Sequence, residues 1–386
     1  MRIALYSPSS LPSATEPCGA ARTAGLVAVA LGVAGHAVET ASRFLPDGGD
    51  DPARRARLDS LGERLAARLA ARLGRAPAAA RPELWLTCRP GDAAPDALGP
   101  AAAAALGIPY VVVEPDPASP GGTDGAGARA VAAADAVVAL TAEAAAGAAA
   151  VAGDRDRIVR VRPFLDLRPF APLGKMRPHY RQALASRLQL PGDALWLLSV
   201  AMMRPGRKLE SYRRLTEALS RVTEPGWCLV IVGDGPARPE VERLLRYLPR
   251  DRFRLAGALP PADLLRVYAS ADLYVWPACR EPHAMAILEA QAAGLPVVAG
   301  RGPGVDDVVR DGVSGRLTAA GNPASFANGL TFLLRHANFR ATYAKGARDT
   351  TLADHGLGRA ADGLDEAVRL AVTRHAGRAG AGAGAG

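Results

Sequence analysis

The sequence predicts an α/β fold with two Rossmann-like, doubly wound domains facing a cleft. The chain has 386 residues, which suits two domains of about 150–200 residues better than one. Short apolar segments alternate with helix-like segments, and this alternation restarts after a stretch rich in proline and basic residues. Such alternation is typical of a parallel sheet with helices on both faces, whose ligands bind beyond the carboxyl ends of the strands.

The first domain is expected over residues 1–165. Its strands are predicted at six apolar segments: 2–6, 37–41, 84–87, 110–113, 136–140 and 158–161. Residues 53–75 are predicted to form a basic amphipathic helix, with leucines on one face and arginines beside them. Two roles suit such a helix: it covers its own sheet, or it lies on a membrane surface.

The segment 166–192 is expected to connect the domains, because its prolines and basic residues interrupt the alternation. The second domain is expected over 193–356, with strands at 196–200, 227–232, 253–256, 273–276 and 297–299. Residues 357–376 are predicted to form a helix that crosses back to the first domain. The Gly/Ala repeat of 377–386 is expected to have no fixed structure.

Composition narrows the function classes. Hydrophobic residues make up 49% of the chain, yet no apolar run approaches the ~20 residues of a membrane span. The N-terminus has no long apolar signal region, so we expect a cytoplasmic protein. The four cysteines form no CxxC pair, which argues against a disulfide framework or a metal site.

The net charge of +9 is carried almost wholly by arginine. A coding bias explains this charge, and so does attraction to phosphorylated ligands or to an anionic membrane surface. No zinc-finger or RNA-binding signature is present, so nucleic acid is not an expected partner.

The segment 280–300 carries two glutamates, Glu281 and Glu289. It is predicted to form a strand end, a loop, a helix that starts near Pro282 and, after Gly294, the next strand. At about 1.5 Å per residue, Glu289 is expected roughly 9 Å along the axis from the helix start. A helix N-terminus also attracts phosphate. This segment is therefore long enough to hold a sugar, a diphosphate and a ribose together.

Three cations, Arg204, Arg207 and Lys208, cluster in a Pro-Gly loop after the first strand of the second domain. Cations at a strand's carboxyl end can hold a diphosphate and stabilise it as a leaving group. The alternative is a solvated basic turn. Among these residues, Arg204 and Lys208 are our candidates for catalysis, together with Glu281.

Three glycine-bearing loops also follow predicted strands. Glycines in these loops permit tight turns and a close approach of the backbone to a ligand. Each loop also has an ordinary structural explanation, because strand-to-helix turns need glycine without any ligand. The candidate ligand-binding positions are Gly19, Gly233, Gly235 and Gly304.

Five motifs in the second domain resemble those of glycosyltransferase family 4, the retaining, glycogen-synthase-like group-1 enzymes of GT-B fold. They are Met-Met-Arg-Pro-Gly at 202–206, Val-Gly-Asp-Gly-Pro at 232–236, Tyr-Val-Trp-Pro at 274–277, Leu-Glu-Ala-Gln-Ala-Ala-Gly-Leu-Pro-Val-Val at 288–298 and Asp-Gly-Val-Ser-Gly at 311–315. The resemblance covers essentially the whole chain and is strongest over 196–320.

The resemblance implies a role for each candidate residue. It implies that Glu281 contacts the donor sugar, that Glu289 binds the ribose hydroxyls, and that Arg204 and Lys208 bind the diphosphate. His283 either touches the donor or is a partly exposed loop histidine. The remaining implied donor contacts are the base pocket at 254–259 with Leu255, the N-terminal loop with Gly19, and the glycines Gly233, Gly235 and Gly304.

The predicted function is a retaining transfer of sugar from a UDP-, GDP- or ADP-sugar to a glycan or lipid-linked acceptor, without a metal or cofactor. The expected location is the cytoplasm or the inner membrane surface. The alternative is a binding or scaffolding subunit that has lost activity. That alternative is favoured by Pro282 and Ala284, and by the lack of a first-domain histidine between His36 and His179, where Arg89 or Asp92 is the candidate substitute.

Overall fold

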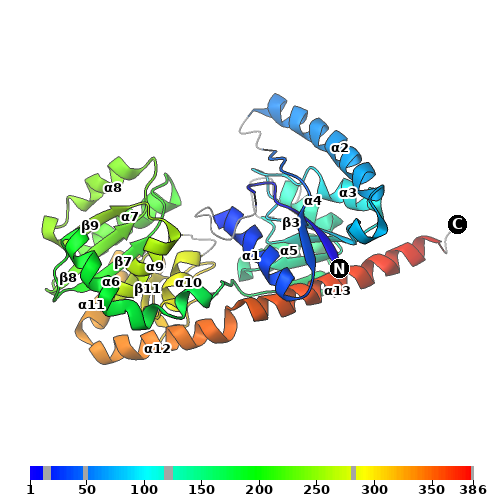
Figure 1. Cartoon of the computed structure of the whole chain (residues 1–386). Coiled ribbons are helices and arrows are strands. Elements are labelled where there is room, and N and C mark those ends of the chain that lie inside the picture. Colours follow the sequence, from blue (N-terminus) through cyan, green and yellow to red (C-terminus); the bar gives the residue numbers. More distant parts are fainter. Residues whose placement is uncertain (12–18, 47–50, 117–124, 280–283, 384–386) are drawn as a thin grey trace. The chain divides into compact units, whose positions relative to one another are not determined.

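The computed structural model describes residues 1–11, 19–46, 51–116, 125–279 and 284–383. The chain divides into two compact units (Figure 1). The first unit consists of Met1–Arg162 together with Leu357–Gly386, and the second unit is Pro163–Gly356. The predicted class, α/β with two Rossmann-like doubly wound domains, is confirmed.

The first unit is built on a parallel sheet of six strands in the order β2-β1-β3-β4-β5-β6. Because β2 lies on one side of β1 and β3 on the other, the strand order reverses at β1. The strands are β1 (Arg2–Tyr6), β2 (Ala37–Thr40), β3 (Leu84–Cys88), β4 (Tyr110–Val113), β5 (Ala136–Ala139) and β6 (Ile158–Arg160).

The helices of the first unit pack in pairs on this sheet. Helix α1 lies against α13 and helix α2 against α3 (Figure 1). The helices are α1 (Gly19–Val33), α2 (Pro52–Gly74), α3 (Gly99–Leu106), α4 (Ala126–Ala133), α5 (Ala142–Ala152) and α13 (Leu357–Ala383). Helix α13 includes residues 377–383, for which the sequence predicts no fixed structure.

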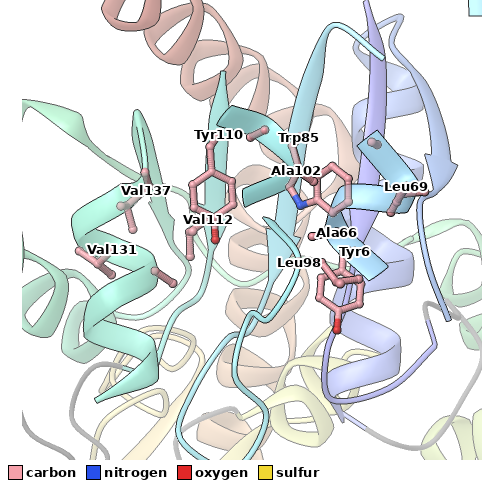
Figure 2. Packing of buried hydrophobic residues seen from close by; sticks show 14 of the residues in the cluster. Tyr6, Ala66, Leu69, Trp85, Leu98, Ala102, Tyr110, Val112, Val131 and Val137 are labelled. Atoms are coloured by element: carbon pink, nitrogen blue, oxygen red, sulfur yellow. The ribbon is translucent and has the colours of Figure 1, made fainter. Parts of the chain in front are cut away.

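One hydrophobic cluster of the first unit lies between its sheet and α2, α3 and α4. Trp85 is fully buried beside Tyr6 and Leu69 (Figure 2). The indole of Trp85 donates a hydrogen bond to the Thr87 hydroxyl at 3.0 Å, so its one polar group is satisfied inside the core.

The second unit repeats the plan with a six-stranded parallel sheet in the order β12-β11-β10-β7-β8-β9. Its strands are β7 (Leu195–Val200), β8 (Trp227–Val232), β9 (Phe253–Gly257), β10 (Leu273–Trp276), β11 (Val297–Gly300) and β12 (Gly315–Thr318). The edge strand β12 was not expected from the sequence, because its four residues show no apolar alternation.

Helices connect these strands and close the unit. They are α6 (Leu173–Leu188), α7 (Arg207–Leu219), α8 (Arg238–Leu245), α9 (Pro261–Ser270), α10 (Met285–Ala292), α11 (Pro323–Arg335) and α12 (Ala337–Asp354). Helix α10 begins at Met285, so Glu289 lies about 6 Å along the axis from its start rather than the roughly 9 Å expected.

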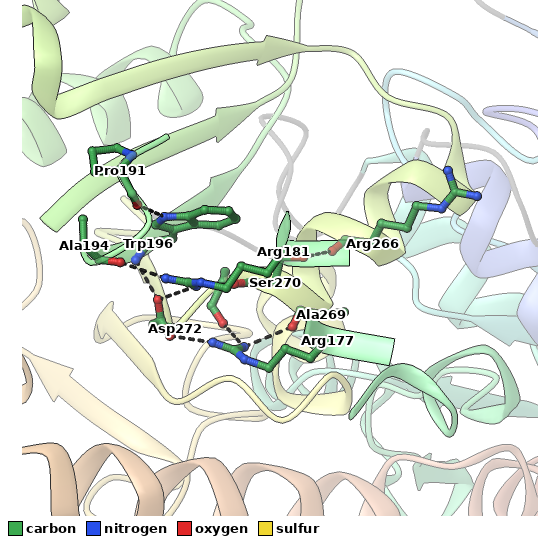
Figure 3. A network of polar contacts seen from close by, with 10 residues as sticks. Arg177, Arg181, Pro191, Ala194, Trp196, Arg266, Ala269, Ser270 and Asp272 are labelled. Atoms are coloured by element: carbon green, nitrogen blue, oxygen red, sulfur yellow. Dashed lines mark hydrogen bonds and ion pairs between the residues drawn. The ribbon is translucent and has the colours of Figure 1, made fainter. Parts of the chain in front are cut away.

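The expected interdomain connection over 166–192 is wrong. Most of this segment forms helix α6, which belongs to the second unit and packs on α9. Arg177 and Arg181 of α6 reach the Asp272 carboxylate at 2.5 and 2.8 Å, and Arg181 also stacks on Trp196 at 4.1 Å (Figure 3). These contacts hold the helix in place although Pro178 lies inside it.

Candidate functional site

The strand order of the second unit reverses at β7, whose neighbours are β8 and β10. At such a switch point the chain leaves adjacent strands in opposite directions, which opens a crevice at their carboxyl ends. Arg204 and Lys208 follow β7, and the glutamate segment follows β10. The topology therefore brings the predicted cations and Glu289 to the same edge of one sheet.

The loop from Arg204 to Lys208, here called the cationic loop, contacts an aromatic side chain through Lys208. Arg204 is exposed, and α7 begins three residues later at Arg207. The Lys208 ammonium nitrogen lies 5.7 Å from the ring centre of Trp276, the last residue of β10. Tyr212, one helical turn after Lys208, meets the same indole edge-on at 5.0 Å. Lys208 and Tyr212 thus bring the start of α7 against the end of β10.

The glycines of the 232–236 motif have a structural reason that the sequence does not show. Gly233 has φ +144°, and a Cβ on it would lie 1.9 Å from the Ala201 carbonyl oxygen. A Cβ on Gly235 would lie 2.4 Å from the Met203 carbonyl oxygen. The Tyr212 hydroxyl donates to the Ala201 carbonyl at 2.8 Å. These glycines therefore let the turn after β8 press against the cationic loop.

Glu289 is a buried carboxylate at this edge. Its side chain belongs to α10 and the residue is only 4% exposed. The Tyr268 hydroxyl donates a hydrogen bond to Glu289 Oε2 at 2.8 Å and lies 3.2 Å from the Ala286 carbonyl oxygen. The Tyr268 ring stacks on Tyr274 of β10. Because Tyr268 fixes one carboxylate oxygen, the orientation of the Glu289 side chain is defined by the fold.

Glu281 and His283 lie outside the described residues. The residues that lead to them are held by the fold: Ala278 is buried and has φ +52°, a conformation that costs a non-glycine residue free energy. The Cys279 backbone N–H donates to the Ser211 hydroxyl of α7 at 2.9 Å. Helix α7 therefore contacts both the cationic loop and the start of the glutamate loop.

The expected base pocket at 254–259 lies at the carboxyl end of β9. Arg254 has a structural role: its guanidinium donates hydrogen bonds to the backbone carbonyls of Leu188 and Gln189 at 3.0 and 2.9 Å. Leu255 is paired in register with Ile231 of β8 and is half-buried. Ala256 and Leu259 line a cavity of about 210 Å³ between α6 and α9.

Gly304 lies in the turn that follows β11. It has φ +77°. Two residues earlier, the Gly302 backbone N–H donates a hydrogen bond to the Asp306 carboxylate at 3.1 Å. The buried Gln291 side chain of α10 donates to the Val308 carbonyl at 2.8 Å. This turn is thus tied to the helix that carries Glu289.

In the first unit, Gly19 is the first residue of α1, which follows β1 at the switch point of that sheet. Of the two candidate substitutes for a first-domain histidine, Asp92 accepts a hydrogen bond from the Ala126 backbone N–H at 2.6 Å and so caps α4. Arg89 follows β3 with φ +56°.

A buried glutamate follows the next strand of this sheet, β4, at the same carboxyl edge. Glu114 follows β4, is 4% exposed and accepts hydrogen bonds from the Leu140 backbone N–H and, at 3.0 Å, from the Thr141 hydroxyl. Burial raises the pKa of Glu114, although Arg89 and Arg160 oppose the shift. No motif in the sequence marks this residue as a site candidate.

Three aromatic residues of the second unit also had no site role predicted from the sequence: Tyr212, Tyr268 and Trp276, the last of which was named only as part of a motif. The spacing of Lys208 and Tyr212, four residues apart on one helix, was the available signal for one of them. Within the described ranges, no group of three or more His, Cys, Asp or Glu side chains is placed to hold a metal ion.

Sequence comparison finds similarity to glycosyltransferases. Residues 195–336 match the family model described as "Glycosyl transferases group 1". The D-inositol 3-phosphate glycosyltransferase of Xylanimonas cellulosilytica is 35% identical over 226 residues, which is 57% of this chain and 53% of that protein. The chain therefore matches about half the length of this curated relative.

Structural comparison shows the fold. The crystal structure of Anabaena Alr3699/HepE in complex with UDP and glucose has a TM-score of 0.72 at 20% identity, covering 96% of this chain and 99% of that one. The catalytic domain of starch synthase IV from Arabidopsis thaliana, bound to ADP and acarbose, has a TM-score of 0.69 at 14% identity, covering 96% and 99%. At these identities the likeness establishes a shared two-domain fold.

Proposed function

We propose that the protein is a glycosyltransferase that moves a sugar from a nucleotide-sugar donor to an acceptor hydroxyl with retention of configuration. The observation that supports the proposal is topological: the cationic loop, Arg204 to Lys208, follows β7, and the helix with the oriented Glu289 carboxylate follows β10, the adjacent strand at the switch point of the second unit. The match of residues 195–336 to a glycosyltransferase model covers this same region.

In the proposed complex, Glu289 accepts hydrogen bonds from the ribose hydroxyls, and Tyr268 keeps its carboxylate in place. Arg204 and Lys208 bind the diphosphate. Leu255 and its neighbours face the base, Gly19, Gly233, Gly235 and Gly304 belong to loops around the donor, and Glu281 and His283 contact the donor sugar.

In the proposed reaction, the bond between the sugar's anomeric carbon and the diphosphate oxygen breaks, and an acceptor oxygen bonds to that carbon on the same face. The acceptor's proton leaves with the nucleoside diphosphate. Arg204 and Lys208 stabilise the charge that develops on the leaving diphosphate. Since these side chains supply positive charge, we propose that the reaction needs no metal ion.

The donor candidates are UDP-, GDP- and ADP-sugars. One fold neighbour is in complex with UDP and another is bound to ADP, which supports the first and the last of these classes. The proposed acceptor is a glycan or a lipid-linked glycoconjugate. The name of the curated relatives adds a phosphorylated polyol as an acceptor class to test. We propose that the protein works in the cytoplasm, at the inner membrane surface when the acceptor is lipid-linked.

Calorimetric titration with the three donor classes tests the proposal. If Glu289 binds the ribose, removing the 2′ and 3′ hydroxyls from the nucleotide weakens binding to the wild type but not to Glu289→Gln, which keeps an acceptor for Tyr268. The expected loss is roughly 10- to 100-fold, the range of a hydrogen bond to a charged group. Glu240→Gln on the exposed surface of α8 is the matched control.

The diphosphate contacts have their own test. Arg204→Gln and Lys208→Gln should weaken UDP binding by roughly 10-fold or more while leaving uridine binding unchanged. Arg243→Gln, an exposed arginine of α8, should change neither. Binding of no nucleotide by the wild type, or equal losses for UDP and uridine, would contradict the assignment. The configuration of the transferred sugar, measured by NMR, decides retention.

A further inference from the structure

Helix α2 carries a one-sided row of arginines, here called the arginine stripe. Its members are Arg54, Arg57, Arg64, Arg68, Arg72 and the C-cap residue Arg75. With Leu61 included, successive members are three or four residues apart, the spacing that keeps side chains on one face of a helix. All six arginines are exposed, and Leu61 is 37% exposed.

The fold uses the other side of this helix. Gly62, Ala66 and Leu69 are buried, α2 packs along α3 (Figure 1), and a Cβ on Gly62 would lie 2.5 Å from the Ala97 side chain. Helix α2 therefore packs on its own domain, as expected, and it does so through the face that carries Gly62, Ala66 and Leu69. The arginine stripe is left on the solvent side of the helix.

The acidic residues of α2 are separated from the stripe. At about 100° per residue, Asp59 and Glu63 lie about half a turn away from the centre of the stripe. Within the described part of the chain, no carboxylate pairs with any of the six guanidinium groups. Between Arg54 and Arg75 the stripe is about 32 Å long and has one sign of charge.

We propose that the arginine stripe is a docking surface for an anionic lipid bilayer. A straight helix offers its stripe to a flat surface, and arginines held within a Debye length of anionic headgroups are attracted to them. Leu61 lies among the cations, where it can enter the boundary between headgroups and acyl chains. A nucleic-acid partner would gain nothing from Leu61, and the stripe has no aromatic residue to stack on bases.

Docking of this kind deepens the proposed function, because it would bring a lipid-linked acceptor to the enzyme. Only this consequence rests on the proposed function; the docking itself does not. No described helix is long and apolar enough to cross a membrane. Attachment through this stripe would be reversible because it depends on surface charge and one leucine, and it would weaken with salt because exposed charges are screened.

Vesicle co-sedimentation of the full-length protein tests the proposal. The probes are mixed phosphatidylglycerol–phosphatidylcholine vesicles and pure phosphatidylcholine vesicles. We expect binding to the mixed vesicles only. Each arginine is worth roughly fivefold in partitioning, so Arg57→Gln, Arg64→Gln and Arg68→Gln together should lower it roughly 100-fold. The matched control removes three exposed arginines from the second unit, by Arg243→Gln, Arg246→Gln and Arg250→Gln.

A site-specific readout checks the orientation. An environment-sensitive fluorophore on Leu61→Cys should shift to the blue when mixed vesicles are added, whereas the same label on Asp59→Cys should not. Equal binding to both vesicle types, equal losses in the two triple variants, or a shift at the Asp59 label would each overturn the proposal. UDP titration of the same preparations separates this result from a failure of the proposed activity, since the stripe variants should bind nucleotide normally.

Discussion

Gly233 offers the sharpest test of how the candidate site is supported. The substitution Gly233→Ala would place a Cβ 1.9 Å from the Ala201 carbonyl oxygen, a distance that real Cβ contacts essentially never show. The residue also has φ +144°, a conformation that is nearly restricted to glycine. To accept the methyl group, the turn after β8 or the cationic loop must move by more than about 1 Å.

Two costs add up in this variant. The backbone conformation costs about 1–3 kcal/mol for a residue with a Cβ, and overpacking costs about 1–3 kcal/mol. We therefore expect Gly233→Ala to lower the free energy of unfolding by about 2–6 kcal/mol. For a unit of this size, Pro163–Gly356, that corresponds to a fall in Tm of about 4–24 °C.

Gly226→Ala is the matched control. Gly226 also has a positive φ, +72°, and opens a strand of the same sheet, but nothing lies within 4 Å of its added Cβ. Gly226→Ala should lower the free energy of unfolding by about 1 kcal/mol, the cost of the left-handed backbone conformation. This corresponds to a fall in Tm of about 2–4 °C. Differential scanning calorimetry measures both variants, and UDP titration should show weaker binding only for Gly233→Ala. Equal Tm values for the two variants would refute the reasoning.

Two further predictions concern carboxylates that the fold holds. Asp272→Asn removes a half-buried carboxylate shared by two arginines of α6 and the Trp196 backbone N–H, and it should lower the free energy of unfolding by about 2–4 kcal/mol in urea. Asp263→Asn, which breaks a single more exposed pair with Arg266, should lower it by less than about 1 kcal/mol. Similar losses would mean that Asp272 does not anchor α6. Because burial raises the pKa of Glu114, the folded state binds its proton more tightly than the unfolded state, so stability should fall as pH rises from 4.5, its ordinary pKa, through the raised pKa. Glu114→Gln should flatten that slope in urea titrations across this range, and an unchanged slope would assign it to other groups.

Much of the candidate site was predictable because its information is local. Strand-to-loop transitions are visible as apolar segments followed by glycine, proline or charge, and parallel strands share one carboxyl edge. The sequence alone therefore assigns Arg204, Lys208 and Glu289 to one edge of the sheet. The same local reasoning failed over 166–192, where prolines indicated a linker. Helix α6 forms there because the Asp272 carboxylate, distant in sequence, binds its arginines.

The sequence by itself determined the fold class, the order of most elements and the loops that carry charge, since hydrophobic periodicity and turn residues are written along the chain. Only the tertiary structure decided which groups those residues meet. The Tyr268 hydroxyl orients Glu289 from 21 positions away. The Ala201 carbonyl explains why residue 233 is glycine. Helix α2 packs on α3 through one face, and its exposed arginines lie on the other. Each of these contacts depends on the close approach of segments distant in sequence, which no local pattern encodes.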